Sequence, residues 1–142
     1  MIDREVTRKK LQELNSYLKE MEKLKTLSWD EFFSSLSKQW MVFHGLQLSI
    51  QIVIDVGNHI LAALGETQIE DYVDIIDKLG ERRIIPLEFA REIRGMAGLR
   101  NILVHEYVKI DLKKIYDILQ NRLTDFYNFI EYISQFLKSK ES

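Results

Sequence analysis

The chain has 142 residues, of which 46% are apolar and 30% charged, with six glycines and one proline. This mixture excludes a disordered chain, a collagen-like repeat and a many-turned β-sandwich, and the absence of cysteine excludes disulfide bonds, thiolate zinc sites and a cysteine nucleophile. Twenty Lys and Arg against 22 Asp and Glu give a net charge of −2, which argues against general coating of nucleic acid, so any contact with RNA must be local.

We expect a single helical domain over residues 1–142, because the length fits one hydrophobic core and no linker, repeat or low-complexity tract divides the chain. The N-terminus lacks the basic and apolar regions of a signal peptide. Polar side chains interrupt the most apolar stretch, 46–64, too often for a bilayer span. The sequence therefore predicts a soluble, cytoplasmic protein that does not cross a membrane.

The first half of the chain predicts two helices, at about 3–25 and about 29–64, and Gly45 marks a place where the second could break. The first has an apolar seam at helical spacing, Leu11, Leu14, Leu18 and Met21. Ser28 and Glu31 form a capping-box pattern at the start of the second.

Residues 46–54 are ambiguous, since apolar and polar residues alternate there as in a strand. Gln47, Gln51, Asp55 and Asn58 also form one polar stripe on an otherwise apolar helix. Because the run continues to Leu64 without a turn signal, longer than most strands, we favour a central helix whose polar stripe must find partners inside the fold.

The second half predicts helices at about 68–80, 86–105 and 111–138. Thr67 and Glu70 suggest a capping box before the first of these, and Pro86 fits the first helical position of the next. The last has a long apolar seam, Leu112, Tyr116, Leu119, Leu123, Phe126, Ile130, Ile133 and Leu137. The predicted fold is thus all-α, an up-and-down bundle of about five helices.

One face of the predicted helix 86–105 is apolar apart from an arginine: Phe89, Ile93, Met96, Arg100, Leu103 and Tyr107. A guanidinium on an apolar stripe needs a partner to replace its lost hydration, and Asp55 is the best candidate. At this point a purely structural buried ion pair remains an alternative to a functional site.

The opposite face gathers basic, polar and glycine residues: Arg91, Arg94, Gly98, Asn101 and His105. Glycine destabilises a helix interior, so Gly95 and Gly98 suggest that a partner helix or a substrate approaches the backbone closely. Arg91 and Arg94 are candidate RNA contacts. The alternative is an ordinary solvated face.

The residues Arg100-Asn101-Ile102-Leu103-Val104-His105-Glu106-Tyr107 form an R-x4-H-x-Y motif with a polar residue directly after the arginine. This motif, in a helix opened by Ile84-Ile85-Pro86, resembles the signature of HEPN-domain proteins, most closely the HepT-type toxins. The resemblance covers about residues 46–135, including the central helix with Asp55, and is weaker over the first 45.

The resemblance implies a metal-independent endoribonuclease that needs no cofactor and works as a homodimer on RNA. Its usual partner is a minimal nucleotidyltransferase antitoxin, which can transfer AMP to the motif tyrosine, here Tyr107. Two alternatives stay open: a non-catalytic module that binds nucleotide or presents Tyr107 to a nucleotidyltransferase, and a purely structural helical dimer.

The motif residues suit RNA cleavage by the 2′-hydroxyl. His105 is the natural acid or base, Arg100 can neutralise the phosphoryl oxygens, and Asn101 could orient the phosphate or the imidazole. On a regular helix, however, Arg100 and His105 point about 140° apart. Either the helix ends or loosens near Val104, or a two-fold dimer brings two motifs to one cleft; we favour the dimer.

Charge is distributed unevenly along the chain. Residues 78–100 contain six basic and three acidic residues, a net charge of +3, whereas residues 55–77 contain six acidic residues and no Lys or Arg, a net charge of −6. The two segments either form a basic cleft for RNA and an acidic flank for a basic partner, or neutralise one another within the bundle.

Overall fold

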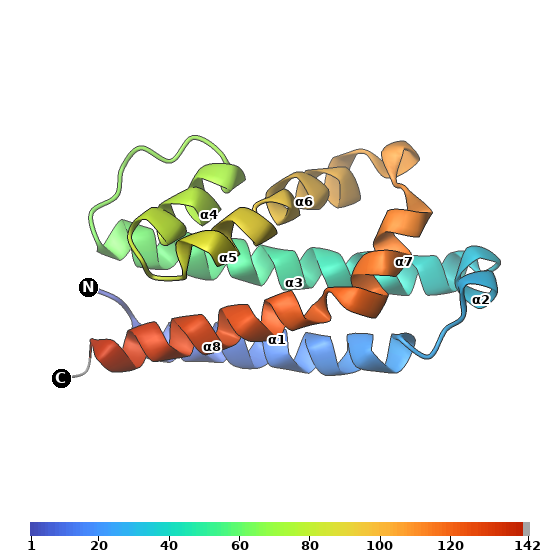
Figure 1. Cartoon of the computed structure of the whole chain (residues 1–142), viewed down its shortest axis with the longest axis horizontal. Helices are drawn as coiled ribbons and strands as arrows, with labels where there is room; N and C mark the ends of the chain where they lie inside the picture. The colour runs from blue at the N-terminus through green and yellow to red at the C-terminus, as the bar shows by residue number, and fades with distance from the viewer. Residues whose placement is uncertain (141–142) are drawn as a thin grey trace.

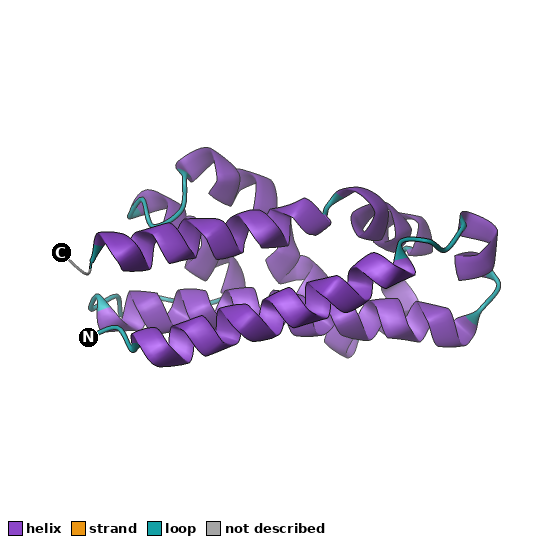
Figure 2. Cartoon of the chain, turned by 90° about the horizontal axis from the view of Figure 1, so that it is seen from below, coloured by secondary structure: helices purple, strands orange, loops and turns teal. Residues whose placement is uncertain are grey.

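The computed structural model describes residues 1–140 of the chain, apart from the side chain of Tyr107. Over this part the fold contains eight α-helices, one short 3-10 helix and no strand, which confirms the predicted all-α class. The helices are α1 (Arg4–Leu24), α2 (Trp29–Phe33), α3 (Leu36–Ala63), α4 (Tyr72–Glu81), α5 (Leu87–Ile93), α6 (Gly95–His105), η1 (Tyr107–Lys109), α7 (Leu112–Asn121) and α8 (Leu123–Ser139). Figure 2 shows the helices and the loops that connect them; the connection between α3 and α4, residues 64–71, forms a wide arc in Figure 1.

The long helix α3 is the centre of the bundle. Figure 1 shows α1 and α8 along one side of it and α4, α5 and α6 along the other. The first residues of α1 and the last of α8 lie at the same end of the molecule (Figures 1 and 2). Residues 46–54 are helical throughout, as predicted. Placed between two groups of helices, α3 can position side chains toward both.

Apolar burial follows the predicted seams. Leu11, Leu14, Leu18 and Met21 of α1 are all buried. The C-terminal seam buries Leu119, Leu123, Phe126, Ile133 and Leu137, while its other members pack at the edge of the core. Burial of these apolar side chains is the main term that holds the helices together.

Among residues 1–140, α3 is the one helix long and apolar enough to cross a membrane by length and composition alone. However, 56% of its most apolar window is buried inside the fold, as in the core helix of a soluble protein. Its apolar character is therefore accounted for by its central place in the bundle.

Three of the predicted helices are divided in the structure. The helix expected at 29–64 stops after Phe33 and restarts at Leu36, because Gln39 Nε2 donates to the carbonyl oxygens of Phe32 and Phe33 while Ser35 caps α3. Gly45, the expected break, lies within α3 against Met21. The Ser28–Glu31 capping box is confirmed.

The other two divisions lie at arginines. The predicted helix 86–105 is interrupted at Arg94, and the predicted helix 111–138 at Arg122. Each side chain contacts another segment: Arg94 binds Asp77 of α4, and Arg122 Nη2 donates to the carbonyl oxygen of Glu92 at 3.4 Å. These tertiary contacts favour the break over a continuous helix.

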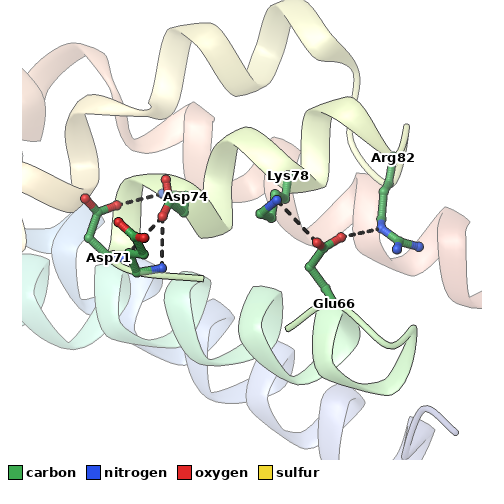
Figure 3. A network of polar contacts seen from close by, with 6 residues as sticks. Glu66, Asp71, Asp74, Lys78 and Arg82 are labelled. Atoms are coloured by element: carbon green, nitrogen blue, oxygen red, sulfur yellow. Dashed lines mark hydrogen bonds and ion pairs between the residues drawn. The ribbon is translucent and has the colours of Figure 1, made fainter. Parts of the chain in front are cut away.

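The start of α4 also differs from the prediction. The helix begins at Tyr72 rather than near residue 68, because Asp71 and Asp74 form the capping box that Thr67 and Glu70 were expected to form. Figure 3 shows the two aspartates at this end of α4. The cap places Tyr72 at the first position of the helix, beside the motif arginine.

The glycines with close neighbours are Gly45, which lies against Met21, and Gly57 and Gly80, whereas those of α6 have none. A Cβ on Gly57 would lie 2.7 Å from Ile75 Cγ2, and one on Gly80 would lie 2.6 Å from Ala90 Cβ. These two glycines therefore let α4 pack tightly against α3 and α5.

Candidate active site

Helix α6 carries the motif and remains helical through His105. The helix closes with a hydrogen bond from the backbone N–H of Glu106 to the carbonyl oxygen of Ile102, at 3.0 Å. The chain therefore does not loosen before the histidine, and Arg100 and His105 project about 140° apart around one axis. The helix ends at His105, close to Val104 where the sequence suggested that it could end or loosen, but this end does not by itself bring Arg100 and His105 to one side.

Arg100 is held by side chains of α3 and α4. It is half-buried, and its Nε donates to Gln51 Oε1 at 3.0 Å. Its guanidinium carbon lies 4.9 Å from the centre of the Tyr72 ring, a cation–π distance. Its Nη1 also donates to Asn101 Oδ1 at 3.3 Å.

Asp55 was the expected partner of Arg100, but the two are not directly paired. Asp55 Oδ1 accepts a 2.8 Å hydrogen bond from Gln51 Nε2, so Gln51 stands between the arginine and the carboxylate. Asp55 Oδ2 lies 3.9 Å from Lys10 Nζ. The prediction had the right stripe of α3 but was wrong by one helical turn, about 5.4 Å along the axis.

His105 is exposed at the last position of α6. Asn101, one turn earlier on the same side, is exposed as well and accepts from Arg100. Tyr107 lies in η1, and its side chain is outside the described part of the chain. The helix thus presents an imidazole to solvent on one side and holds a guanidinium against the bundle on the other.

The outer face of α6 is open. Gly95 and Gly98 are both exposed, and a Cβ built on either would meet no atom within 4 Å. Nothing in the described part of the chain makes the close approach that these glycines suggested. The cost of glycine in this helix is therefore not explained by packing within one protomer.

The two candidate RNA-binding arginines differ in whether a carboxylate of the same chain binds them. Arg91 is exposed and makes no ion pair within residues 1–140. Arg94 binds Asp77 through Nε and Nη2, both at 3.0 Å, and the hydrogen bond together with the carboxylate charge raises the pKa of Arg94. Its charge is already neutralised by α4.

Other ion pairs also join the acidic and basic segments. Glu66 accepts from Arg82 Nε at 3.0 Å and lies 3.3 Å from Lys78 Nζ, as Figure 3 shows. Hydrogen bonds from Arg82 and then Lys78 lower the pKa of Glu66. The hypothesis that the two segments neutralise one another is therefore confirmed for Lys78, Arg82 and Arg94.

Sequence reasoning missed two side chains at this site. Gln51 lies on the predicted polar stripe of the central helix, but nothing in the spacing distinguishes it from Gln47 or Asn58. Tyr72 carried no signal at all, since its contact with Arg100 depends on how α4 packs. Within residues 1–140, no three His, Asp or Glu side chains group together in a way that suits a metal ion.

The chain is similar to known proteins over nearly its whole length. The family model described as ribonuclease HepT-like matches residues 14–133, which extends the resemblance into α1. A tRNA nuclease HepT of Aphanizomenon flos-aquae is 30% identical over 132 residues, covering 93% of this chain and 90% of the relative. An mRNA nuclease HepT of Shewanella oneidensis is 31% identical over 105 residues, covering 72% and 77%.

Solved structures have the same fold as this chain. The fold matches a tri-AMPylated Shewanella oneidensis HEPN toxin, solved in complex with an MNT antitoxin, with a TM-score of 0.84, 25% identity and coverage of 95% of this chain and 99% of that one. A toxin–antitoxin structure with AMP-PNP matches with a TM-score of 0.83 at 23% identity, covering 92% and 98%. The chain belongs to the ribonuclease HepT-like family.

Proposed function

We propose that this protein is a metal-independent endoribonuclease toxin that cuts RNA where two copies of α6 meet. The observation that carries the proposal is the motif geometry: a half-buried Arg100 oriented by three side chains and an exposed His105 on one helix. Relatives named as tRNA and mRNA nucleases support the reaction class but differ in their RNA, so the substrate class proposed here is RNA.

The proposed reaction uses the 2′-hydroxyl of the RNA as nucleophile. His105 of one protomer removes the hydroxyl proton while the 2′-oxygen bonds to phosphorus, and a second His105 protonates the departing 5′-oxygen. The products are a 2′,3′-cyclic phosphate and a 5′-hydroxyl. Arg100 neutralises the charge that develops on the phosphoryl oxygens.

The orientation of these side chains supports the proposed homodimer. One straight helix cannot aim both Arg100 and His105 at a single phosphate, whereas a two-fold pair of helices supplies two of each. The open face at Gly95 and Gly98 supports a partner helix there, because small residues let backbones approach closely.

The partner of the toxin is proposed to be a cognate minimal nucleotidyltransferase antitoxin in the cytoplasm. The AMPylated HEPN toxin of Shewanella oneidensis was solved with an MNT antitoxin, and on this basis we propose Tyr107 as the AMP acceptor. An added AMP two residues after His105 would block RNA by bulk and by negative charge. The alternative is a non-catalytic module that binds nucleotide or the antitoxin without cutting RNA.

The test is cleavage of total cellular RNA by the purified, unmodified protein. His105→Ala should abolish cleavage and growth arrest, whereas His44→Ala, which removes an exposed histidine of α3, should leave both intact. Undiminished cleavage by His105→Ala would rule out the proposed site. A wild-type protein that binds the antitoxin but cuts no RNA would support the non-catalytic alternative.

A further inference from the structure

Gln51 lies between Arg100 and Asp55 in a short chain of hydrogen bonds. Arg100 Nε donates to Gln51 Oε1 at 3.0 Å, and Gln51 Nε2 donates to Asp55 Oδ1 at 2.8 Å. We propose that Gln51 is a positioning residue: it holds Arg100 with a neutral oxygen and keeps it from pairing with Asp55, so that its charge remains available to an RNA phosphate. This inference rests on the proposed ribonuclease function.

The chemistry of the three groups fixes the orientation of the Gln51 amide. A guanidinium can only donate hydrogen bonds, and a carboxylate can only accept them. The Gln51 oxygen must therefore face Arg100 while its NH2 group faces Asp55. The carboxylate acts on the arginine indirectly, by locking the amide that holds it.

A second arginine in the same protein shows what direct pairing would do. Arg94 donates hydrogen bonds from Nε and Nη2 to the two oxygens of Asp77. The edge of the guanidinium that carries these two nitrogens is therefore occupied, and its charge is neutralised. Arg100 gives only Nε to Gln51 and one N–H of Nη1 to Asn101. Within residues 1–140, three of its five N–H groups therefore have no protein partner.

Tyr72 completes the arrangement. Its ring lies 4.9 Å from the guanidinium carbon and supports one side of Arg100 without using any N–H group. The Asp71–Asp74 capping box fixes the turn that begins at Tyr72. Gln51 and Tyr72 thus orient the guanidinium from two elements and leave Nη2 for phosphate.

The test replaces Gln51 with a side chain of the same size that carries a charge. Gln51→Glu can no longer donate to Asp55, so two carboxylates then face Arg100 and pair with it, which removes its positive charge from the RNA site. For a mixed-sequence, single-stranded RNA with non-reactive 2′-O-methyl groups, we expect affinity to fall about 10- to 100-fold. The slope of log K against log salt should fall in magnitude by about 0.7 per lost phosphate contact.

Gln47→Glu is the matched control, because it adds the same charge one turn earlier on the same stripe of α3. It should leave both affinity and salt slope close to those of the wild type. Equal effects of the two variants would show that only net charge matters and would overturn the proposal, as would a Gln51→Glu variant that binds like the wild type. Thermal unfolding checks that both variants fold.

A spectroscopic measurement separates this inference from the proposed function. The 15N-resolved NMR signal of the Arg100 Nε–H should exchange slowly with water in the wild type and rapidly in Gln51→Leu. A wild-type protein that cuts no RNA, yet shows this protected signal, would refute the ribonuclease function while retaining the contact. An unprotected signal in the wild type would refute the role of Gln51 whether or not RNA is cut.

Discussion

Arg94 and Asp77 form a two-point ion pair, in which Nε–Oδ1 and Nη2–Oδ2 both measure 3.0 Å. The pair joins the residue between α5 and α6 to the middle of α4. It also neutralises the charge of Arg94, which the sequence predicted to contact RNA. Position on the same helical face thus does not make two basic residues equivalent, because only one of them meets a carboxylate within the bundle.

Arg91→Ala should therefore weaken RNA binding more than Arg94→Ala. Arg91 is exposed and has no ion-pair partner in the described part of the chain, so a phosphate can use its full charge. Its removal should lower the magnitude of the salt slope by about 0.7 for single-stranded RNA, measured by fluorescence anisotropy in a His105→Ala background. Arg94→Ala should change the slope little and lower the melting temperature instead. Equal slopes for the two variants would contradict this assignment.

Glu66 gives a prediction that depends on pH. Hydrogen bonds from Arg82 and then Lys78 hold the pKa of Glu66 below its ordinary value of 4.5, so the folded state favours the charged carboxylate. The stabilisation is present above the ordinary pKa and is lost as the pH falls through the lowered one. Glu66→Gln should therefore lower the melting temperature at pH 7, and the difference from wild type should shrink below about pH 4.

The control for this experiment is Glu88→Gln. Glu88 lies in the first turn of α5, is exposed, and has no ion pair within residues 1–140. Its replacement should change the melting temperature little, both at pH 7 and below about pH 4. A difference between Glu66→Gln and wild type that persists at low pH would show that packing or helix geometry, rather than the ion pairs, was changed.

The sequence predicted those parts of the fold that depend on local periodicity. The seams of α1 and α8 and the helical state of residues 46–54 follow from spacing alone, because burial requires one continuous apolar face. The breaks at Arg94 and Arg122 do not, since each is favoured by a side chain that reaches another segment. The capping box of α4 was mispredicted because two such patterns, Thr67–Glu70 and Asp71–Asp74, follow one another directly in the sequence.

The candidate site was likewise predicted only in part from the sequence. The motif placed Arg100, Asn101 and His105 on one helix, and the polar stripe of α3 contained the residue that meets the arginine. Whether Arg100 meets Gln51 or Asp55, however, depends on the position of α6 along the axis of α3. Periodicity defines the face of a helix but not this axial register, because residues one turn apart occupy the same face.

Gly80→Ala should destabilise the protein by about 1–3 kcal/mol, the usual cost of overpacking a core. An added methyl carbon would lie 2.6 Å from Ala90 Cβ, and this atom is attached directly to the backbone of α5, so it cannot rotate aside as a long side chain could. The measurement is denaturant unfolding. Adding Ala90→Gly removes the opposing atom, so the double variant should show a favourable coupling energy relative to the sum of the single changes. Additive effects would show that the two helices are not in close contact.

Gly98→Trp should disrupt the proposed dimer without unfolding the protomer. A Cβ at Gly98 meets no atom within 4 Å in the protomer, so the larger side chain can be accommodated in solution but not between two closely packed α6 helices. We expect sedimentation velocity to show a shift from dimer to monomer and RNA cleavage to fall by at least about tenfold, because a monomer cannot aim both Arg100 and His105 at one phosphate. Lys19→Trp, on the exposed side of α1, should remain dimeric and active. A Gly98→Trp protein that stays dimeric and cuts RNA at the wild-type rate would place the interface on another face, and the site would then have to be completed by a different element.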